Sequence, residues 1–290
     1  MSNRPPFKQA FTFDDVLLVP QKSNVLPRDV NLKTRLTNKI ELNLPILSAA
    51  MDTVTESDMA IALARTGGIG VIHKNLSIEE QSNMVDRVKR SESGMILNPI
   101  TVEESSTIKE AKKIMAEYKI SGLPVEKNDR LVGIITNRDI RFETNDLLTV
   151  SECMTSEDLV TVPVGTSLEK AKDILQQHRI EKLLVVDEDH NLTGLITVKD
   201  IQKNEDFPNA CKDSNGRLRV AAAIGVSGDA FERANELANV DIDAIVIDTA
   251  HGHSRGVLET ISKIKNDNPN IAVIAGNVAT GDGTKALIDS

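Results

Sequence analysis

Two four-residue segments of this chain place a hydroxyl, a cation and a carboxylate at the same spacing. They are Thr136-Asn137-Arg138-Asp139 and Thr197-Val198-Lys199-Asp200, and each follows an apolar run that predicts a strand. At a junction between a strand and a helix, the carboxylate can accept hydrogen bonds from both ribose hydroxyls of a nucleotide, and the cation and the helix N-terminus can bind phosphate. The alternative is that each aspartate only caps the following helix. Because the segment recurs, we favour the nucleotide site.

The two segments belong to a longer internal repeat. Residues 97–142 and 157–203 carry one pattern at an offset of 60 to 61 positions. Each half predicts strand, helix, strand, strand and short helix. The spacing of Thr107 with Glu110, and of Thr166 with Glu169, predicts a capping box at the start of the first helix in each half. Neither half can bury the apolar face of its helix alone, so we expect the two copies to pack face to face.

The repeat interrupts a second pattern, which runs up to about residue 94 and resumes near residue 215. Here continuous apolar runs alternate with amphipathic segments, which is typical of βα units with parallel strands buried on both faces. Thr55 with Asp58, and Ser77 with Glu80, have the spacing of capping boxes, and Gly67-Gly68 predicts a helix end. We expect strands at 45–50, 69–73, 220–226, 243–247 and 271–275, each followed by a helix.

Five βα units are compatible with two architectures. A closed (β/α)₈ barrel needs eight units, and an open doubly wound sheet can be built from five. The periodicity does not decide between them. In either case one domain is inserted into another, with residues 1–94 and 205–290 forming the outer domain and residues 95–204 forming the insert.

Composition limits the class of protein. The net charge of -9 argues against broad binding to nucleic acid or to an anionic membrane surface. No segment approaches the apolar length of a membrane span, and the N-terminus lacks the apolar core of a signal peptide. Two cysteines, Cys153 and Cys211, are too few for a disulfide framework, so we expect unpaired thiols and a cytoplasmic protein.

The repeat resembles the CBS domain, and the pair of copies resembles a Bateman module. The resemblance covers about 105 residues and rests on the paired strands that end in Thr-x-[Arg/Lys]-Asp. It implies that a purine nucleotide of the ATP or GTP type binds between the copies. Asp139 and Asp200 would then contact ribose, and Arg138, Lys182 and Lys199 would be the candidates for phosphate.

The outer domain resembles the family of inosine-5′-monophosphate (IMP) dehydrogenase and GMP reductase. The resemblance rests on Thr12–Pro20, Pro45–Thr55, Gly67–Asn75, Asp248–Ser254 and Ala275–Thr280. With a CBS pair inserted after the second βα unit, it favours the dehydrogenase and implies a (β/α)₈ barrel. It also implies IMP as substrate, NAD as cofactor and a homotetramer, with pairing into octamers through the insert as a further option.

The same resemblance implies roles for individual residues. Ser48 and Met51 would lie at the substrate nucleotide, with Met51 against the hypoxanthine. Asp248 would hold the cofactor ribose, and Thr249, Ala250, His251, His253 and Asn277 would line the NAD site. The two histidines alone could suggest a metal, but no thiolate or carboxylate set completes a zinc site.

The family's nucleophile is implied to lie outside this sequence. The family oxidises IMP through a cysteine on a loop after the sixth strand, which a potassium ion braces, whereas this chain ends at Ser290 in its fifth βα unit. Neither Cys153 nor Cys211 occupies that place. We therefore expect the chain alone to be inactive. The rival functions are a GMP reductase, which would use NADPH and most of which lack the insert, and a stand-alone CBS nucleotide sensor.

Overall fold

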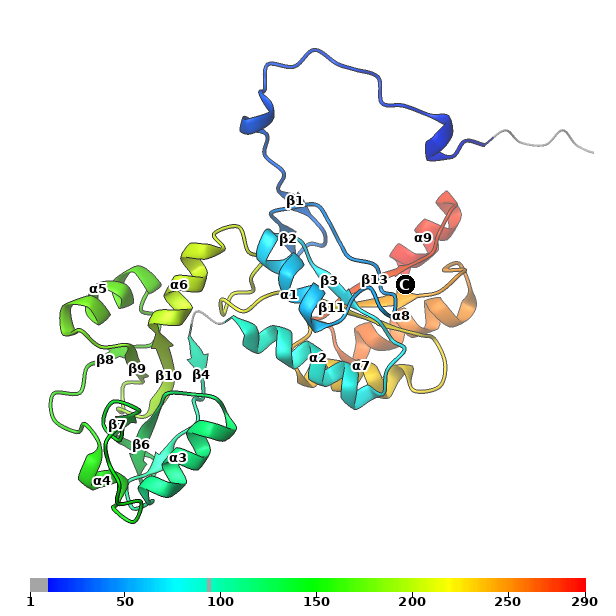
Figure 1. The fold of residues 1–290 in the computed structure, drawn as a ribbon. Coiled ribbons are helices and arrows are strands. Elements are labelled where there is room, and N and C mark those ends of the chain that lie inside the picture. Colours follow the sequence, from blue (N-terminus) through cyan, green and yellow to red (C-terminus); the bar gives the residue numbers. More distant parts are fainter. Residues whose placement is uncertain (1–9, 93–94) are drawn as a thin grey trace, which may run out of the picture. The chain divides into compact units, whose positions relative to one another are not determined.

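The computed structural model describes residues 10–92 and 95–290 and divides into two compact units (Figure 1). The first unit, Met1–Leu32, contains two short 3-10 helices in its described part, η1 (Phe13–Asp15) and η2 (Pro27–Asp29). Its apolar side chains are mostly exposed, and Leu17 and Leu18 are 95% and 97% exposed. The second unit, Lys33–Ser290, contains the rest of the predicted outer domain and the predicted insert.

The outer domain is built on a parallel sheet. Its strands are β3 (Gly70–Ile72), β11 (Val220–Ile224), β12 (Ala244–Asp248) and β13 (Ala272–Gly276), hydrogen-bonded in that order. A parallel bridge between Leu47 and Ile69 extends the sheet on the β3 side. The spatial order therefore follows the chain order throughout. Barrel strands do this, whereas a doubly wound sheet reverses its order at a switch point.

A helix follows the Leu47 bridge and each of the four strands. These helices are α1 (Ser57–Thr66), α2 (Ile78–Ser91), α7 (Ala230–Asn239), α8 (Arg255–Asp267) and α9 (Gly281–Asp289). All five residues of β11 are buried, and successive side chains point to opposite faces of the sheet. Val220, Ala222 and Ile224 belong to the apolar cluster that includes the helices, and Ala221 and Ala223 belong to a second cluster on the other face.

A small hairpin supplies part of the second cluster. Its strands, β1 (Thr34–Arg35) and β2 (Glu41–Leu42), are antiparallel, and Ile40 and Leu42 are fully buried. Cys211 joins the same cluster, with its Sγ 3.5 Å from the carbonyl oxygen of Glu41. The segment by which the chain returns from the insert is thus packed into the outer domain.

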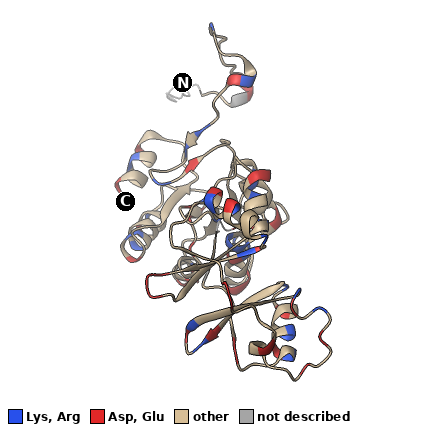
Figure 2. Ribbon diagram, turned by 90° about the vertical axis from the view of Figure 1, so that its left-hand side faces the viewer, with Lys and Arg blue, Asp and Glu red and all other residues tan. Residues whose placement is uncertain are grey.

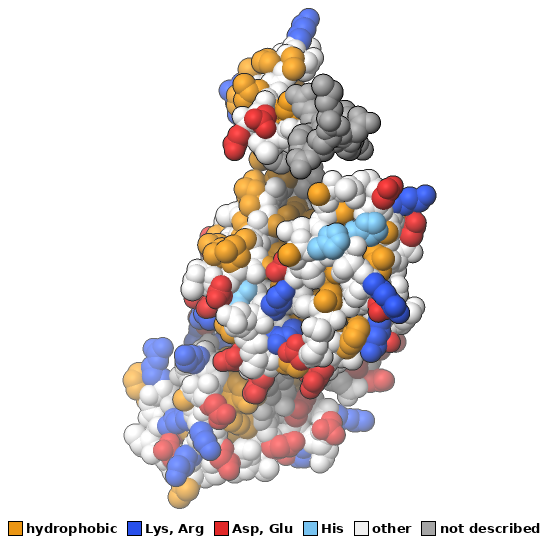
Figure 3. Space-filling view, turned by 90° about the vertical axis from the view of Figure 1, so that its right-hand side faces the viewer, with side chains coloured by type: hydrophobic (Ala, Val, Ile, Leu, Met, Phe, Trp, Pro, Cys, Tyr) orange, Lys and Arg blue, Asp and Glu red, His pale blue; other side chains and the backbone are white. Residues whose placement is uncertain are grey.

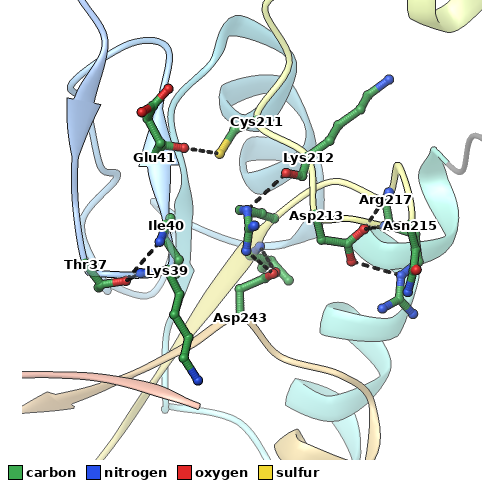
Figure 4. A network of polar contacts seen from close by, with 12 residues as sticks. Thr37, Lys39, Ile40, Glu41, Cys211, Lys212, Asp213, Asn215, Arg217 and Asp243 are labelled. Atoms are coloured by element: carbon green, nitrogen blue, oxygen red, sulfur yellow. Dashed lines mark hydrogen bonds and ion pairs between the residues drawn. The ribbon is translucent and has the colours of Figure 1, made fainter. Parts of the chain in front are cut away.

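Buried ion pairs fix this return segment in place (Figure 4). The Asp213 carboxylate accepts hydrogen bonds from the backbone N–H groups of Asn215 and Arg217 and from Arg217 Nε. The Asp243 carboxylate accepts from Arg219, at 3.0 Å, and from Lys89 Nζ, at 2.5 Å. Burial tends to raise the pKa of both carboxyls. Lys89 and Arg217 outweigh it and lower the pKa of Asp213, while the pKa of Asp243 stays raised.

The insert consists of two halves with one element order. The first has β5 (Val102–Glu103), α3 (Ile108–Glu117), β6 (Gly122–Lys127) and β7 (Arg130–Thr136). The second has β8 (Thr161–Pro163), α5 (Leu168–His178), β9 (Lys182–Val186) and β10 (Leu192–Thr197). The internal repeat predicted from sequence is confirmed at this level. Figure 1 shows α6 (Val198–Asp206) after the second half, and α4 (Val150–Cys153) lies between the halves.

Each half receives an edge segment that precedes the other half in the chain. The strand β4 (Ile96–Leu97) comes before the first half but pairs with β10 of the second. Thr155 comes before the second half but bridges to Ile134 of β7 in the first. This exchange ties the two copies together, whereas their face-to-face packing stays a prediction.

Several local predictions are confirmed and several are wrong. Helix α1 ends at Gly67, which has a φ of 108°, and Ser77–Glu80 and Thr107–Glu110 form capping boxes. Thr55 does not cap α1, because its hydroxyl donates to the carbonyl of Ala49. Helix α5 is capped by Ser167 in place of Thr166, whose hydroxyl donates to Pro163.

Two further predicted elements differ from the structure. The predicted strand at 45–50 is reduced to the bridge at Leu47. Residues 137–142, after β7, form turns in place of the predicted short helix. The expected domain boundary at residue 94 falls on residues 93–94, which lie outside the described residues. In the described ranges, we find no helix long and apolar enough to cross a bilayer.

Candidate functional site

The loop after the Leu47 bridge holds the first two predicted site residues. Ser48 N donates to the Ile69 carbonyl at 3.2 Å, and Ser48 Oγ accepts from Val71 N at 3.4 Å. The carbonyl of Met51 accepts from the N–H groups of Val54 and Thr55, so the loop folds back on itself. The Met51 side chain is 58% exposed beside this fixed backbone and is free to contact a ligand.

Asp248 ends β12, at the carboxyl edge of the sheet. Lys74, two residues beyond β3, donates from Nζ to the Asp248 carbonyl at 2.6 Å and lies 3.6 Å from Oδ2. The Asp248 side chain is 44% exposed. Its carboxylate is therefore held at the strand ends by one cation and remains open to solvent, which suits an acceptor for ribose hydroxyls.

The remaining cofactor candidates lie on two segments that are bonded together. Thr249 donates from N and Oγ1 to the carbonyl of Gly276, and Asn277 N donates to the Thr249 carbonyl at 2.7 Å. The N–H of Gly252 donates to the Asn277 carbonyl at 2.6 Å. A Cβ on Gly252 would lie 2.8 Å from that oxygen, so the approach needs glycine. Ala250, His251 and His253 are exposed on the same loop.

Histidine side chains reach the surface on the face shown in Figure 3, next to hydrophobic ones. Acidic and basic side chains alternate on that face and along the ribbon in Figure 2. Neither view shows a continuous basic stripe of the kind that binds nucleic acid. Within residues 10–92 and 95–290, no three His, Cys, Asp or Glu side chains gather in a group that could hold a metal ion.

Neither thiol lies at this edge of the sheet. Burial raises the pKa of Cys211 to about 11, and Cys211 packs beside Glu41 in the second apolar cluster, on the face of the sheet away from the helices. Burial and nearby carboxylates such as Glu143 raise the pKa of Cys153, which lies in the insert. Both thiols stay protonated near neutral pH, and protonated thiols are poor nucleophiles.

In the insert, each repeated aspartate bonds back to the threonine three residues earlier: Asp200 completes a capping box with Thr197, the N-cap of α6, and Asp139 closes a turn with Thr136. Asp139 Oδ2 accepts from N and Oγ1 of Thr136, each at 2.7 Å, and Asp200 Oδ2 accepts from N and Oγ1 of Thr197 at 3.0 and 2.5 Å. The capping alternative is thus seen for one oxygen of each carboxylate. A ribose contact would use the other oxygen, Oδ1.

The cations of the insert come together between its halves. Lys182 Nζ, from the second half, donates to Ser121 Oγ of the first half at 3.0 Å. Arg138, from the first half, lies 3.7 Å from Glu181 of the second. Burial lowers the pKa of Lys182, and repulsion from Lys199 and Arg138 adds to the effect while Glu181 opposes it. The charges of Lys199, Arg138 and Asp139 thus all act on Lys182, and Asn137 N donates to the carbonyl of Ser121, the residue whose hydroxyl accepts from Lys182.

Two polar residues that follow β3, Lys74 and Asn75, lie beside the predicted site and were not assigned a role from sequence. Lys74 contacts Asp248, and Asn75 Nδ2 donates to Asp52 Oδ2 at 3.1 Å. The turn at residues 73–75 therefore connects the loop of Met51 with the end of β12. Their position directly after a buried strand was the available signal, because polar residues at the carboxyl ends of barrel strands face the site.

The chain is similar to known proteins over nearly its whole length. Residues 10–290 match the family described as the IMP dehydrogenase / GMP reductase domain. The chain is 56% identical over 284 residues to inosine-5′-monophosphate dehydrogenase of Halalkalibacterium halodurans and 55% identical over 286 residues to that of Bacillus subtilis. Each match covers 98% of this chain and 59% of the relative. The chain thus spans about three fifths of the length of these curated relatives.

Solved structures with the same fold are also similar in sequence. GMP reductase from Trypanosoma brucei in complex with guanosine 5′-triphosphate superimposes with a TM-score of 0.84 at 37% identity, covering 98% of this chain and 69% of that chain. The same protein with guanosine 5′-monophosphate gives a TM-score of 0.84, covering 61% of that chain.

Proposed function

Since the chain belongs to the IMP dehydrogenase / GMP reductase family, we propose that its gene product oxidises inosine 5′-monophosphate to xanthosine 5′-monophosphate with NAD. The observation that carries the proposal is the identity of 55–56% to IMP dehydrogenases over 98% of this chain. NAD accepts a hydride in such a reaction. The proposal extends to a closed (β/α)₈ barrel, for which the chain-ordered parallel sheet is the support.

The described residues divide between two parts of this site. Ser48 and Met51 would bind the substrate nucleotide, with the exposed Met51 side chain against the purine. Asp248 would accept hydrogen bonds from the cofactor ribose, beside the loop formed by Thr249, Ala250, His251 and His253 and bonded to Asn277. The same proposal includes a nucleophilic cysteine, a potassium ion and a homotetramer. We assign the cysteine and the potassium ion to parts of the enzyme other than residues 1–290.

The role of Asp248 is tested by its alanine variant. In the full gene product, Asp248→Ala should raise the KM for NAD about 10- to 150-fold, because a hydrogen bond to a charged group contributes roughly 1.5–3 kcal/mol. The KM for IMP should change little. Lys74 bonds to the backbone carbonyl of Asp248, so that contact persists in the variant. Steady-state kinetics with either substrate varied is the measurement.

A matched control removes an equal charge elsewhere. Asp267 is exposed at the last residue of α8, away from the strand ends. Asp267→Ala should leave both KM values unchanged. Equal KM values for NAD in the wild type and Asp248→Ala would contradict the assignment of Asp248.

We further propose that the insert, residues 95–204, is a tandem CBS pair that binds purine nucleotides of the ATP or GTP type and regulates the enzyme. The supporting observations are that Lys182 and Arg138 each contact the opposite half, that the charge of Lys199 lowers the pKa of Lys182, and that each half carries a capping aspartate. Because Asp139 and Asp200 also serve as caps, alanine variants would disturb the fold as well as the site.

The test separates capping from ribose binding. Asp200→Asn keeps an acceptor oxygen for Thr197 but removes the charge, whereas Asp200→Ala removes both. Both variants should weaken ATP or GTP binding about 10- to 150-fold if the carboxylate contacts ribose. Asp139→Asn and Asp139→Ala should behave likewise at the second site. Calorimetric titration measures the affinity. If both asparagine variants bind ATP or GTP as tightly as the wild type, the two aspartates serve the cap or turn only and do not contact ribose.

A GMP reductase is the second candidate. The observation that favours it is the TM-score of 0.84 to structures of a GMP reductase that align with 98% of this chain, the insert residues included. The presence of an insert therefore does not separate the two functions. Identity is higher to the dehydrogenases, at 55–56% against 37%, and for that reason we place the dehydrogenase first.

A further inference from the structure

His73 directly follows β3 and is buried although it is polar. Its side chain is 4% exposed. Nδ1 accepts a hydrogen bond from the backbone N–H of Asn75 at 3.2 Å, so Nδ1 carries no proton and the neutral ring bears its proton on Nε2. Nε2 makes no hydrogen bond within the described ranges, and it lies 3.9 Å from Oε1 of Glu56.

This contact is a turn of the kind that asparagine and aspartate usually make. In such turns a side-chain oxygen of one residue accepts from the backbone N–H two residues later. His73 uses a ring nitrogen as the acceptor at the same spacing. Glu56 faces the opposite ring nitrogen and favours the tautomer with its proton there, which leaves Nδ1 free to accept.

The base of this turn is fixed to the sheet. Gln81 is fully buried and donates from Nε2 to the carbonyls of His73 and Ala223, both at 2.9 Å. Arg233, itself 5% exposed, donates to the Gln81 side chain at 3.0 Å and to the Leu76 carbonyl at 2.9 Å. The peptide of His73 is thereby held to the end of β11, and the bond to Asn75 determines how the chain continues from it.

The far end of the turn holds the loop that carries Met51. Asn75 Nδ2 donates to Asp52 Oδ2 at 3.1 Å, and Asp52 is the residue after Met51. A continuous series of contacts therefore runs from the buried ring of His73 through Asn75 to Asp52. Both Asn75 and Asp52 are exposed, so the orientation of their side chains depends on these bonds.

We propose that His73 is a positioning residue for the purine nucleotide site. It orients Asn75, and Asn75 holds Asp52 so that Met51 is placed against the base. The inference rests on the proposed function, because that function assigns Met51 to the substrate. His73 positions Asn75 through its acceptor nitrogen Nδ1, and the volume of the ring contributes less to this positioning.

Two substitutions separate these contributions. His73→Asn keeps an acceptor that can reach the N–H of Asn75 but removes most of the ring volume. His73→Phe keeps a ring of similar size but removes the acceptor. In the full gene product, His73→Phe should raise the KM for IMP roughly tenfold, as expected for one lost hydrogen bond. His73→Asn should retain most of the affinity, and the KM for NAD should change less than about twofold in both.

If the His73 ring only fills space, the two variants should rank in the reverse order of KM for IMP. His73→Asn would then leave a cavity and be the worse variant, and His73→Phe would be tolerated. That order, or equal KM values for IMP in the wild type and His73→Phe, would overturn the inference. If His73→Phe does not fold, Asn75→Asp breaks the same series at an exposed position by placing a carboxylate against Asp52. It should raise the KM for IMP by a similar factor, and an unchanged KM would equally overturn the inference.

A second measurement separates this inference from the proposed function. Hydrogen exchange of the Asn75 amide, followed by NMR in residues 1–290, reports on the turn without any substrate. Fast exchange in His73→Phe and slow exchange in His73→Asn would support the turn. Equal exchange in both would refute it. Failure of the wild-type gene product to bind IMP would count against the proposed function, while the exchange data would still decide the role of Nδ1.

Discussion

Lys89 shows how single residues stabilise the region where the insert rejoins the outer domain. It is 3% exposed, and its Nζ lies 3.1 Å from Asp213 Oδ2 and 2.5 Å from Asp243 Oδ2. A buried charge that loses its partner is costly, because neither water nor another ion can replace it. The two carboxylates come from segments that are distant in sequence, so this cluster joins α2 to the return segment and to β12.

We predict that Lys89→Ala lowers the free energy of unfolding by about 3–5 kcal/mol, the usual cost of removing one partner from a buried ion pair. The adjacent Arg90 is the control, because its ion pair with Asp86 lies on the surface. Arg90→Ala should cost less than about 1 kcal/mol. Urea unfolding followed by circular dichroism measures both. Equal midpoints for the two variants would mean that the cluster does not stabilise the fold.

The resemblance of short motifs to the family gave the predicted site residues but not their contacts, and the binding roles of these residues stay predictions. Asp248 and Met51 were predicted to be at the site, and both lie partly exposed at the carboxyl edge of the sheet. Lys74 and Asn75 were missed as contact residues because their partners, Asp248 and Asp52, are 174 and 23 positions away. Such pairings depend on how the strands are ordered, which periodicity does not give.

At the scale of elements, sequence signals succeeded where the contact was local. Ser77 and Glu80 cap α2 as predicted, because both partners lie within one turn of helix. Thr55 and Asp58 have the same spacing but form no cap, since the hydroxyl of Thr55 bonds to Ala49 in the site loop. The expected strand at 45–50 is likewise limited to one bridge. For Thr55, a bond within the site loop, to a residue six positions earlier, replaced the cap.

The packing of α1 on β3 gives a prediction at this scale. A Cβ on Gly70 would lie 2.5 Å from the Cα of Ala60, which is backbone and cannot move aside. Gly70→Ala should therefore push α1 off the sheet and lower the free energy of unfolding by about 1–3 kcal/mol. Gly281, the first residue of α9, is the control, because no atom lies within 4 Å of its added Cβ.

Gly281→Ala should change the free energy of unfolding by less than about 0.5 kcal/mol. Thermal unfolding of both variants is the measurement. If Gly70→Ala were as stable as Gly281→Ala, the close approach of α1 to β3 would not exist in solution.

At the scale of the whole molecule, the described chain brings the proposed binding residues to one edge of the sheet and places neither thiol there. In the described ranges β13 pairs only with β12, and both thiols lie away from the strand ends with a raised pKa. Hydride loss from the purine needs prior addition of a nucleophile. We predict that residues 1–290 alone show no IMP-dependent reduction of NAD. Turnover by this chain alone would show that its own residues supply the nucleophile.

The most direct test of the proposed function uses the full gene product and the absorbance of reduced nicotinamide. The protein is supplied in parallel with IMP and NAD, and with GMP and NADPH. An IMP dehydrogenase should produce NADH in the first mixture, lose most of this activity at low NAD in the Asp248→Ala variant, and leave NADPH unchanged in the second. Consumption of NADPH with GMP, without NADH formation from IMP, would contradict the proposal and establish the reductase.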